Sequence, residues 1–575
     1  MNGKRLRTVL NGRGLREKNT KLMRLFDELT GIKQAWRLMQ PKQLLFVLLA
    51  GYCTLRESLQ NANAAGPVWP TPDSEPPLYM QATNITTTNV LGVAETRKTR
   101  SLTIEDCIQL ALEHNLDIQI QRLNPVINQY GLNVTYGVYE PTATFTGTKS
   151  YNDFPSGAGI NPSTGLPYLS NVGEADSYSP SIAGVLPTGL SYDLTANTSR
   201  NIEQGFPNPI YGSPLWSSEF NLALKQPLLK NLWIDGNRLQ IQLNKATLKI
   251  SEQAFRLQVM TSVTAVKSAY YNLLYARGNV EANAKAYELA EQLVRENLKR
   301  VQVGSLAPLD ERQSESQAAA SLAAMQAAQQ ALVVQENLLK NLLTDNYSDW
   351  AEVTLLPSEQ LIAVPQELNL QESWRRAVAQ RPELIEAKLN VQKQNVTLKY
   401  DFNQIFPELD VIGSYGRNAI ENTLGSSLDD IRQGDHSAYS YGAFMSIPLG
   451  GNYSGRNQYK SGKVSLKQLL LTLKQTEQGI VVAVDNDVGN VRSTLQQVDA
   501  TRDARIYAEQ ALDAERKKLE NGKSTSFIVL QLISNLTTAK VNEIQALATY
   551  NIAVAQLALD DGSTLEANHI DLKLR

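Results

Sequence analysis

The chain has 575 residues, an ordinary apolar content and 19% charged residues, which excludes the disordered and collagen-like classes. This length allows several domains or one very elongated domain. The net charge of −2 is uneven, because residues 1–64 hold twelve Lys and Arg against four Asp and Glu, giving +8 there and −10 elsewhere. An acidic remainder argues against nucleic-acid binding.

An apolar run at residues 44–53 (LLFVLLAGYC) follows Lys42 and precedes A-N-A at 62–64. This order of basic, apolar and small residues predicts a signal peptide cleaved near Ala64. The run is too short for a transmembrane helix, which needs about 20 apolar residues. Because residues 1–38 are an unusual prefix, we expect translation to start at Met39.

Two other interpretations of the apolar run at residues 44–53 remain open. The first is a cytoplasmic arm followed by a buried helix. The second is a lipoprotein signal at Cys53, against which the bulky Tyr52 argues.

Beyond this segment Cys107 is the only cysteine, so the mature chain cannot form an internal disulfide. His114, His436 and His569 show no metal-ligand spacing. No nucleophile elbow, phosphate-binding loop or Cys/His pairing is present. The sequence therefore predicts no metal, no cofactor and no enzyme.

Residues 65–100, rich in Pro and Thr, predict a linker or an extended arm. The chain after residue 100 consists of two internal sequence repeats. IEDCIQLALEHNLDIQIQRLN (104–124) aligns without a gap with LQESWRRAVAQRPELIEAKLN (370–390). NRLQIQLNKATLKIS (237–251) likewise aligns with GRNQYKSGKVSLKQL (455–469). Counted from Arg238 and Arg456, both copies reach a glycine at the same distance.

Each repeat alternates between two kinds of sequence, one typical of helices and the other typical of strands. Proline-free stretches rich in Ala, Leu, Gln, Glu and Lys carry apolar residues at three- and four-residue steps and predict long helices. The blocks at about 142–226 and 408–449 hold most of the prolines and show the two-residue period of strands. In SEFNLALKQPLL, Phe220, Leu222 and Leu224 fall on one face and Asn221 and Lys225 on the other.

The expected helices differ in length in an informative way. Those at 238–303 and 456–521 would each run about 100 Å, at 1.5 Å per residue. Shorter helices at 103–140, 306–344, 369–406 and 524–560 would stack end to end beside them. Helices of this length suit a tube that spans a gap rather than a compact globule.

Each repeat is expected to contain a helix, strands, a long helix, a glycine turn and a second helix, in that order. This order, found twice, resembles the TolC-like outer-membrane efflux family over residues 101–562. The matching segments are SLTIEDCIQLALEHN at 101–115, E-P-T at 140–142, QPLL at 226–229, IPLG at 447–450 and VGSLAPLDE at 303–311.

The resemblance implies a fold class: a membrane β-barrel plus a long α-helical coiled-coil barrel, built from two internal repeats, with a homotrimer sharing one barrel. It also implies an exit duct for efflux or type I secretion, in the outer membrane with a periplasmic extension. A periplasmic adaptor (membrane fusion) protein and an inner-membrane transporter would be the partners. The physics agrees, because only closed barrels satisfy strand edges in lipid. Tyr439, Tyr441 and Phe444 are expected as outward-facing interface aromatics.

The expected divisions are 1–64 N-terminal extension and signal peptide; 65–100 linker; 101–345 repeat 1; 346–368 connecting segment; 369–562 repeat 2; and 563–575 tail.

Two groups of residues become candidate sites through the resemblance. The helix tips, expected to dock the adaptor or simply to turn the chain, are Val303, Gly304, Ser305, Leu306, Asn521, Gly522 and Lys523. The candidate gate residues are Asp310, Ile528 and Gln531. Asp310 could equally be a solvated carboxylate that favours the start of its helix.

The sequence departs from the family pattern in three places. Residues 178–199 read as an extra hairpin that would either join the barrel or cap it. Ile528 and Gln531 stand where well-studied members carry acidic residues. The second tip, ENGKSTSF at 520–527, lacks an apolar residue after its glycine.

A periplasmic coiled-coil scaffold is the alternative function, although it leaves the strand blocks unexplained. Within the channel class the sequence does not separate drug, metal and protein export.

Overall fold

A computed structural model describes residues 98–155, 165, 170–204, 215–305, 307–434 and 436–572. The predicted signal peptide, nearly all of the predicted linker, and Leu306 lie outside the described residues. The described residues fall in one compact unit, which begins at Glu95.

Helices form most of this unit. The first half contains α3 (Ile104–His114), α4 (Leu116–Tyr136), the short η1 (Gly137–Tyr139), α5 (Gly236–Gln302) and α6 (Pro308–Leu343). The second half contains α7 (Leu370–Gln380), α8 (Pro382–Asn403), α9 (Leu424–Gln433), α10 (Tyr453–Glu520), α11 (Ser526–Asp560) and α12 (Thr564–Ala567). The short η2 (Tyr347–Trp350) lies between the halves.

The two longest helices match in length, with 67 residues in α5 and 68 in α10. Each begins at a side-chain cap: Asp235 accepts from the Arg238 amide at 2.7 Å, and Asn452 accepts from the Gly455 amide at 3.1 Å. Helices of this length are about 100 Å long. No helix in the described ranges combines the length and hydropathy of a membrane span.

Two of the shorter helices predicted as continuous are broken. Asn115 has extended backbone angles, ends α3 and caps α4 by accepting from the Ile118 amide at 3.1 Å. Arg381 is extended because Pro382 follows it, and it separates α7 from α8. Each break turns one predicted helix into a short piece and a longer one.

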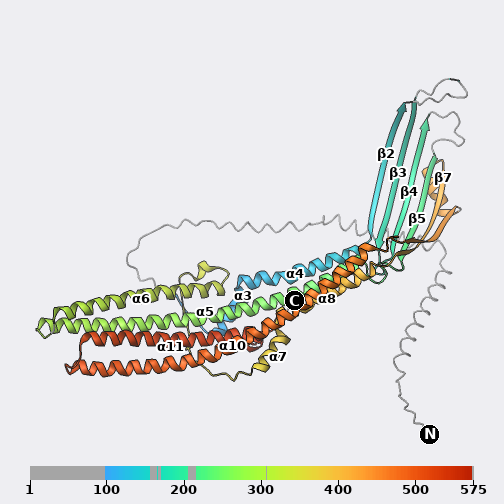
Figure 1. Ribbon diagram of the computed structural model, residues 1–575. Helices are drawn as coiled ribbons and strands as arrows, with labels where there is room; N and C mark the ends of the chain where they lie inside the picture. The colour runs from blue at the N-terminus through green and yellow to red at the C-terminus, as the bar shows by residue number, and fades with distance from the viewer. Residues whose placement is uncertain are drawn as a thin grey trace, which may run out of the picture. The chain divides into compact units, whose positions relative to one another are not determined.

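Six antiparallel strands form one sheet in the order β2-β3-β4-β5-β7-β8. They are β2 (Thr142–Pro155), β3 (Ser170–Val185), β4 (Ser191–Gln204), β5 (Leu215–Pro227), β7 (Glu408–Glu421) and β8 (Ser437–Ser446). The strands lie at one end of the long helices, and the α5–α6 and α10–α11 turns lie at the other (Figure 1).

Two features of the strands were not predicted. Helix α9 interrupts the second strand block, between β7 and β8. A second, two-stranded sheet pairs β1 (Lys98–Leu102) in parallel with β6 (Val353–Pro357), joining the end of the expected linker to the connecting segment.

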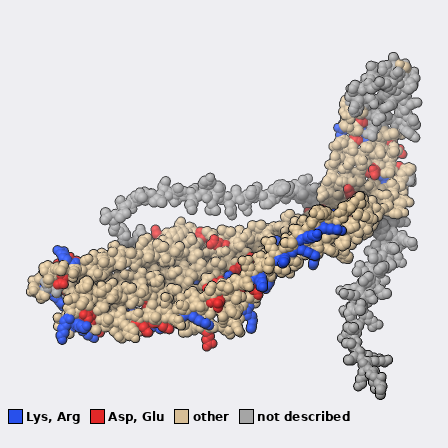
Figure 2. Space-filling model, in the orientation of Figure 1, with Lys and Arg blue, Asp and Glu red and all other residues tan. Residues whose placement is uncertain are grey.

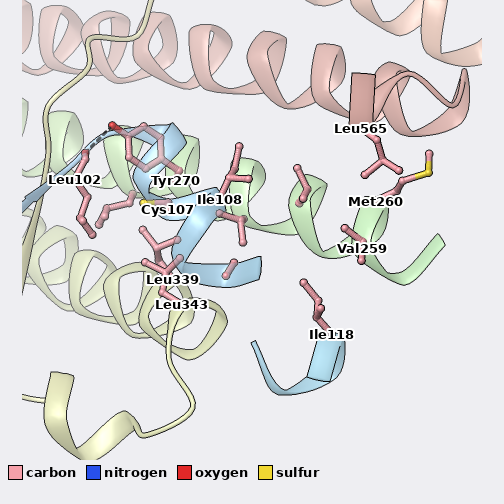
Figure 3. Packing of buried hydrophobic residues seen from close by; sticks show 14 of the residues in the cluster. Leu102, Cys107, Ile108, Ile118, Val259, Met260, Tyr270, Leu339, Leu343 and Leu565 are labelled. Atoms are coloured by element: carbon pink, nitrogen blue, oxygen red, sulfur yellow. Dashed lines mark hydrogen bonds between the residues drawn. The ribbon is translucent and has the colours of Figure 1, made fainter. Parts of the chain in front are cut away.

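Three apolar clusters hold the helices together. The first, beside the small sheet, includes Leu102, Tyr270 and Leu343, and the Tyr270 hydroxyl donates to the Leu102 carbonyl at 3.2 Å (Figure 3). The second joins α7, α8, α10 and α11, and the third joins α5, α10 and α11 toward their turns. Leu565 of α12 belongs to the first cluster, so part of the expected C-terminal tail packs against the helices.

Candidate functional site

The α5–α6 and α10–α11 turns share one backbone geometry. Gly304 has a φ of +76° and Gly522 a φ of +70°. After α5, the Ser305 amide donates to Arg300 at 2.8 Å and the Gly304 amide to Val301 at 2.9 Å. The corresponding bonds after α10 run from Lys523 to Lys518 at 2.9 Å and from Gly522 to Leu519 at 3.0 Å. Both turns are therefore Schellman motifs, whose left-handed position favours glycine.

The predicted tip residues that the structure describes are all exposed. Val303 has 78% of its surface exposed, and a side chain added at Gly304 or Gly522 would meet nothing within 4 Å. Lys and Arg gather at these tips (Figure 2). Among them, Lys517 binds Asp513 at 2.7 Å and Lys518 binds Glu515 at 2.9 Å. The two tips therefore expose their turn residues and charged side chains at one end of the long helices.

One buried polar contact near the tips was not predicted. The Ser526 hydroxyl, in the first turn of α11, donates to the side-chain oxygen of Asn297 on α5 at 2.8 Å. Both side chains are buried, and the Asn297 side-chain nitrogen has no described partner. The contact fixes the start of α11 against α5, beside the apolar residues Leu293 and Val529.

Among the described residues, no hydrogen bond or ion pair joins the three predicted gate residues to one another. Asp310 is half-buried in the first turn of α6 and makes no ion pair with a described residue. Ile528 is 43% exposed and Gln531 is exposed, on the side of α11 opposite the buried Val529 and Ile533. The Gln531 amide donates to Asn535 at 3.1 Å. A ring built from α11 would therefore carry apolar and amide side chains.

The six-stranded sheet has one apolar and one polar face, as its register defines. Phe145 pairs with Pro180, Ile182 with Leu194, and Leu222 with Tyr415. The large apolar and aromatic residues on this face are Phe145, Tyr151, Tyr178, Ile182, Tyr192, Leu194, Phe220, Leu222, Leu224, Val411, Tyr415, Tyr439, Tyr441 and Met445. Many are exposed in the protomer, up to 86% for Tyr441.

The opposite face carries hydroxyl and amide side chains. Thr144 and Ser181 share a hydrogen bond at 2.6 Å, and the Ser179 hydroxyl donates to Asn197 at 2.9 Å. A hollow of about 630 Å³ is lined from this face by Thr142, Ser191, Asp193, Lys225, Ser414 and Ser440. The sheet is therefore concave on its polar side.

Phe444 corrects the prediction for the three interface aromatics. Tyr439 and Tyr441 lie on the apolar face, but Phe444 lies on the polar face, as the other even-numbered residues of β8 do. There the Lys225 ammonium sits 5.7 Å from its ring centre. An even step along a strand keeps the face and an odd step changes it, so three aromatics at 439, 441 and 444 cannot share one face.

Charges bound the apolar face at the end away from the helices. Lys149, Asp176, Arg200 and Trp216 stand opposite one another on β2 to β5. Arg200 forms an ion pair with Asp176, and its guanidinium lies 5.6 Å from the Trp216 ring centre. Such a row of charged and indole side chains is typical of the level where an apolar surface meets water.

Helix α9 covers part of this face beside that row. The Ser427 hydroxyl donates to Ser218 of β5 at 2.7 Å, and the Arg417 guanidinium donates to the Ile431 carbonyl at 3.0 Å. Thr423 and Gly434 cap the helix, and these residues at its two ends are the signal that could have predicted it.

The described residues hold no group of three His, Cys, Asp or Glu placed to bind a metal ion. Cys107 is fully buried, and burial, with nearby carboxylates, raises the pKa of its thiol to about 12. It is therefore a packing residue rather than a nucleophile.

Comparisons with known proteins agree with this architecture. Residues 374–563 match the family model described as outer membrane efflux protein. The outer membrane protein TolC of Escherichia coli is 22% identical over 329 residues, which cover 55% of this chain and 64% of that relative.

Solved channels share the fold. The CmeC outer membrane channel of Campylobacter jejuni superimposes with a TM-score of 0.58 at 15% identity, covering 80% of this chain and 86% of that one. The outer membrane protein VceC of Vibrio cholerae gives a TM-score of 0.57 at 14% identity, covering 80% of this chain and 96% of that one. Residues 374–563 therefore match the outer membrane efflux protein family, and the described chain shares its fold with solved outer membrane channels.

Proposed function

We propose that this protein is an outer-membrane channel that passively conducts substrates delivered from the inner membrane. The observation that carries the proposal is the six-stranded sheet, apolar on one face and polar on the other, joined directly to helices of 67 and 68 residues. A sheet with such faces can border lipid outside and water inside. Helices about 100 Å long can cross a periplasmic gap.

The assembly in this proposal is a homotrimer with one shared barrel and two structural repeats in each copy. Support comes from α4, whose outer face carries a continuous apolar stripe in the single protomer: Leu116, Ile120, Leu123, Ile127, Tyr130 and Val134, each 51–76% exposed. A helix in a folded protein buries such a stripe against a neighbour. A second copy of the chain would supply that neighbour.

The proposed location is the outer membrane, with the helices extending into the periplasm and a signal peptide removed near Ala64. A coiled-coil scaffold is not favoured, because it gives no role to an apolar sheet face with aromatic residues up to 86% exposed.

The two turns are the proposed docking site for a periplasmic adaptor, which would link the channel to an inner-membrane transporter. Support comes from their shared geometry and exposure. Replacing Gly304 and Gly522 together by valine would distort both tips without touching the buried clusters. We expect export to be lost while the trimer persists. The matched control replaces Gly479, which lies within α10 in open space, and should leave export unchanged. Normal export by the tip variant would contradict docking at the turns.

The proposed gate is a ring of uncharged side chains from α11 at the periplasmic end. Ile528 and Gln531 would form it, with Asp310 outside the narrowest ring. Ile528→Ser should make cells more permeable to large antibiotics, because it removes apolar contacts around the axis. Asp310→Asn should have little effect. The reverse order of effects would assign the gate to the carboxylate.

The first experiment is extraction from outer-membrane fractions followed by electron microscopy in detergent. Trimeric rods well over 100 Å long with a detergent belt at one end are expected. Compact, soluble or two-stranded particles would contradict the channel proposal.

A further inference from the structure

The two edge strands of the sheet have no partner on their outer side in the part of the chain that the structure describes. β2 pairs only with β3, and β8 only with β7, among the described strands. Every side chain of β2 and β8 whose exposure the structure describes is exposed, whereas the inner strands are partly covered. An open edge at the level of a membrane leaves backbone donors and acceptors unsatisfied, which lipid cannot compensate. Both edges therefore need a partner strand.

A second copy of this chain supplies a matching edge. All five strand pairings are antiparallel, and the number of strands is even. β8 of one copy and β2 of the next therefore run antiparallel when copies follow one another around a ring. Apolar residues such as Phe145 and Tyr441 then continue along one face, and Thr146 and Ser440 along the other.

The hairpin of β3 and β4 is an integral part of this wall. β3 pairs with β2 from Thr142 to Pro155, and β4 pairs with β5 from Leu215 to Lys225. The turn between them is short: Leu186 donates to the Leu190 carbonyl at 2.8 Å, and Gly189 has a φ of +84°.

The side chains of the hairpin follow the faces of the whole sheet. Tyr178 and Ile182 lie with the apolar residues, and Ser179 and Ser181 lie with the hydroxyl and amide residues. A hairpin that capped the pore from outside would have no reason to keep this alternation in register with both neighbours.

We infer that three copies of this chain close an eighteen-stranded barrel, six strands from each copy, by pairing the β2 edge of one copy with the β8 edge of the next. The inference rests on the proposed trimeric channel. Without β3 and β4 the same trimer would have twelve strands. With strands about 4.8 Å apart and tilted about 40°, eighteen strands give a backbone radius of about 18 Å and twelve give about 12 Å. The hairpin thus widens the pore by about one half and more than doubles its cross-section.

The test counts the strands. The full-length protein and a variant that joins Pro155 to Leu215 through a short Gly-Asn-Gly linker would be reconstituted in lipid nanodiscs and imaged by cryo-electron microscopy. We expect eighteen strands and a backbone diameter of about 36 Å in the wild type, and twelve strands and about 24 Å in the variant. A trimeric wild-type ring of twelve strands, with β3 and β4 outside the wall, would overturn this inference and leave the channel function standing. Particles without a trimeric barrel would overturn both.

A labelling experiment keeps the inference testable if the shortened variant does not fold. Tyr178→Cys and Ser179→Cys are neighbours on opposite faces of β3, and the native Cys107 is buried. Ser179→Cys should react with a charged, water-soluble thiol reagent. Tyr178→Cys should be protected from it, and a fluorophore placed there should be quenched by brominated lipid. Equal reaction of both positions with the water-soluble reagent would place the hairpin outside the wall.

Discussion

Asp487 of α10 gives the sharpest stability prediction, because it is a carboxyl group held beside a second carboxyl group. Asp560, at the end of α11, binds Arg381 at 3.0 Å, and Arg381 also binds Glu383 at 3.1 Å. Burial, reinforced by a hydrogen bond to Asp560 and by its charge, raises the pKa of Asp487 to about 7, although Arg381 opposes the shift. One buried oxygen of Asp487 has no hydrogen-bond partner among the described residues. When protonated, its hydroxyl can donate to Asp560.

The sign of the pH dependence follows from this shift. The folded-state pKa lies above the unfolded value of 3.8, so folding favours the protonated form. The contribution of Asp487 to stability is therefore fully present below about pH 4, falls between pH 4 and pH 7, and is lost above pH 7. The difference between a pKa of about 7 in the folded state and 3.8 in the unfolded state corresponds to about 4 kcal/mol, which partial solvent exposure reduces to about 2–3 kcal/mol.

Asp487→Asn should remove this dependence, because an amide stays neutral and can still donate to Asp560. At pH 8 the variant should unfold at a higher denaturant concentration than the wild type, and at pH 4 the two should be nearly equal. Helical circular dichroism during denaturant unfolding measures the difference. Asp485→Asn, an exposed neighbour on the same helix, is the matched control and should change little. Equal stability of wild type and Asp487→Asn at pH 8 would refute the reasoning.

Two further substitutions test the turns and the core. Gly304→Ala should cost about 1–2 kcal/mol, because alanine resists the left-handed backbone, whereas Gly479→Ala in a helical position should stabilise by about 0.5–1 kcal/mol. If both changes have the same sign, the turn is not the source of the strain. Tyr270→Phe removes one donor to the Leu102 carbonyl, but Ser358 still donates to it at 3.1 Å, so the loss should be about 1 kcal/mol in denaturant unfolding. A loss above about 3 kcal/mol would show that the hydroxyl has a larger role than one shared acceptor.

The sequence predicted the long helices and the strand faces well, because both depend on local periodicity. A 67-residue run without proline leaves few alternatives to a helix, and alternation such as Phe220, Leu222 and Leu224 fixes a face once the strand is known. The prediction for Phe444 failed because it considered only that the residue is aromatic. It overlooked that position 444 is an odd number of residues away from 439 and 441 and therefore lies on the other face of the strand.

Long-range contacts were out of reach of the sequence. β1 and β6 are five residues each and lie about 250 residues apart, so neither shows a period long enough to identify it. The buried hydrogen bond between Ser526 and Asn297 likewise joins residues far apart in the chain, and each alone is typical of a helix surface. The Asp487–Asp560 pair was missed for the same reason.

The placement of the extra hairpin depends on both kinds of information. Its alternation from Tyr178 to Ser181 predicts strands, but it does not say which neighbours they join. The register answers that question, because β3 and β4 separate β2 from β5 and no described residue of β2 pairs with β5 directly. Removing the hairpin would therefore create a new strand pairing as well as shorten a loop. In the proposed trimeric barrel the hairpin therefore sets the circumference of the wall, while the matched lengths of α5 and α10 set the length of the helical part. The proposed assembly thus specifies the width of the barrel and the length of the helical tube by separate segments of the chain, and each can change without the other.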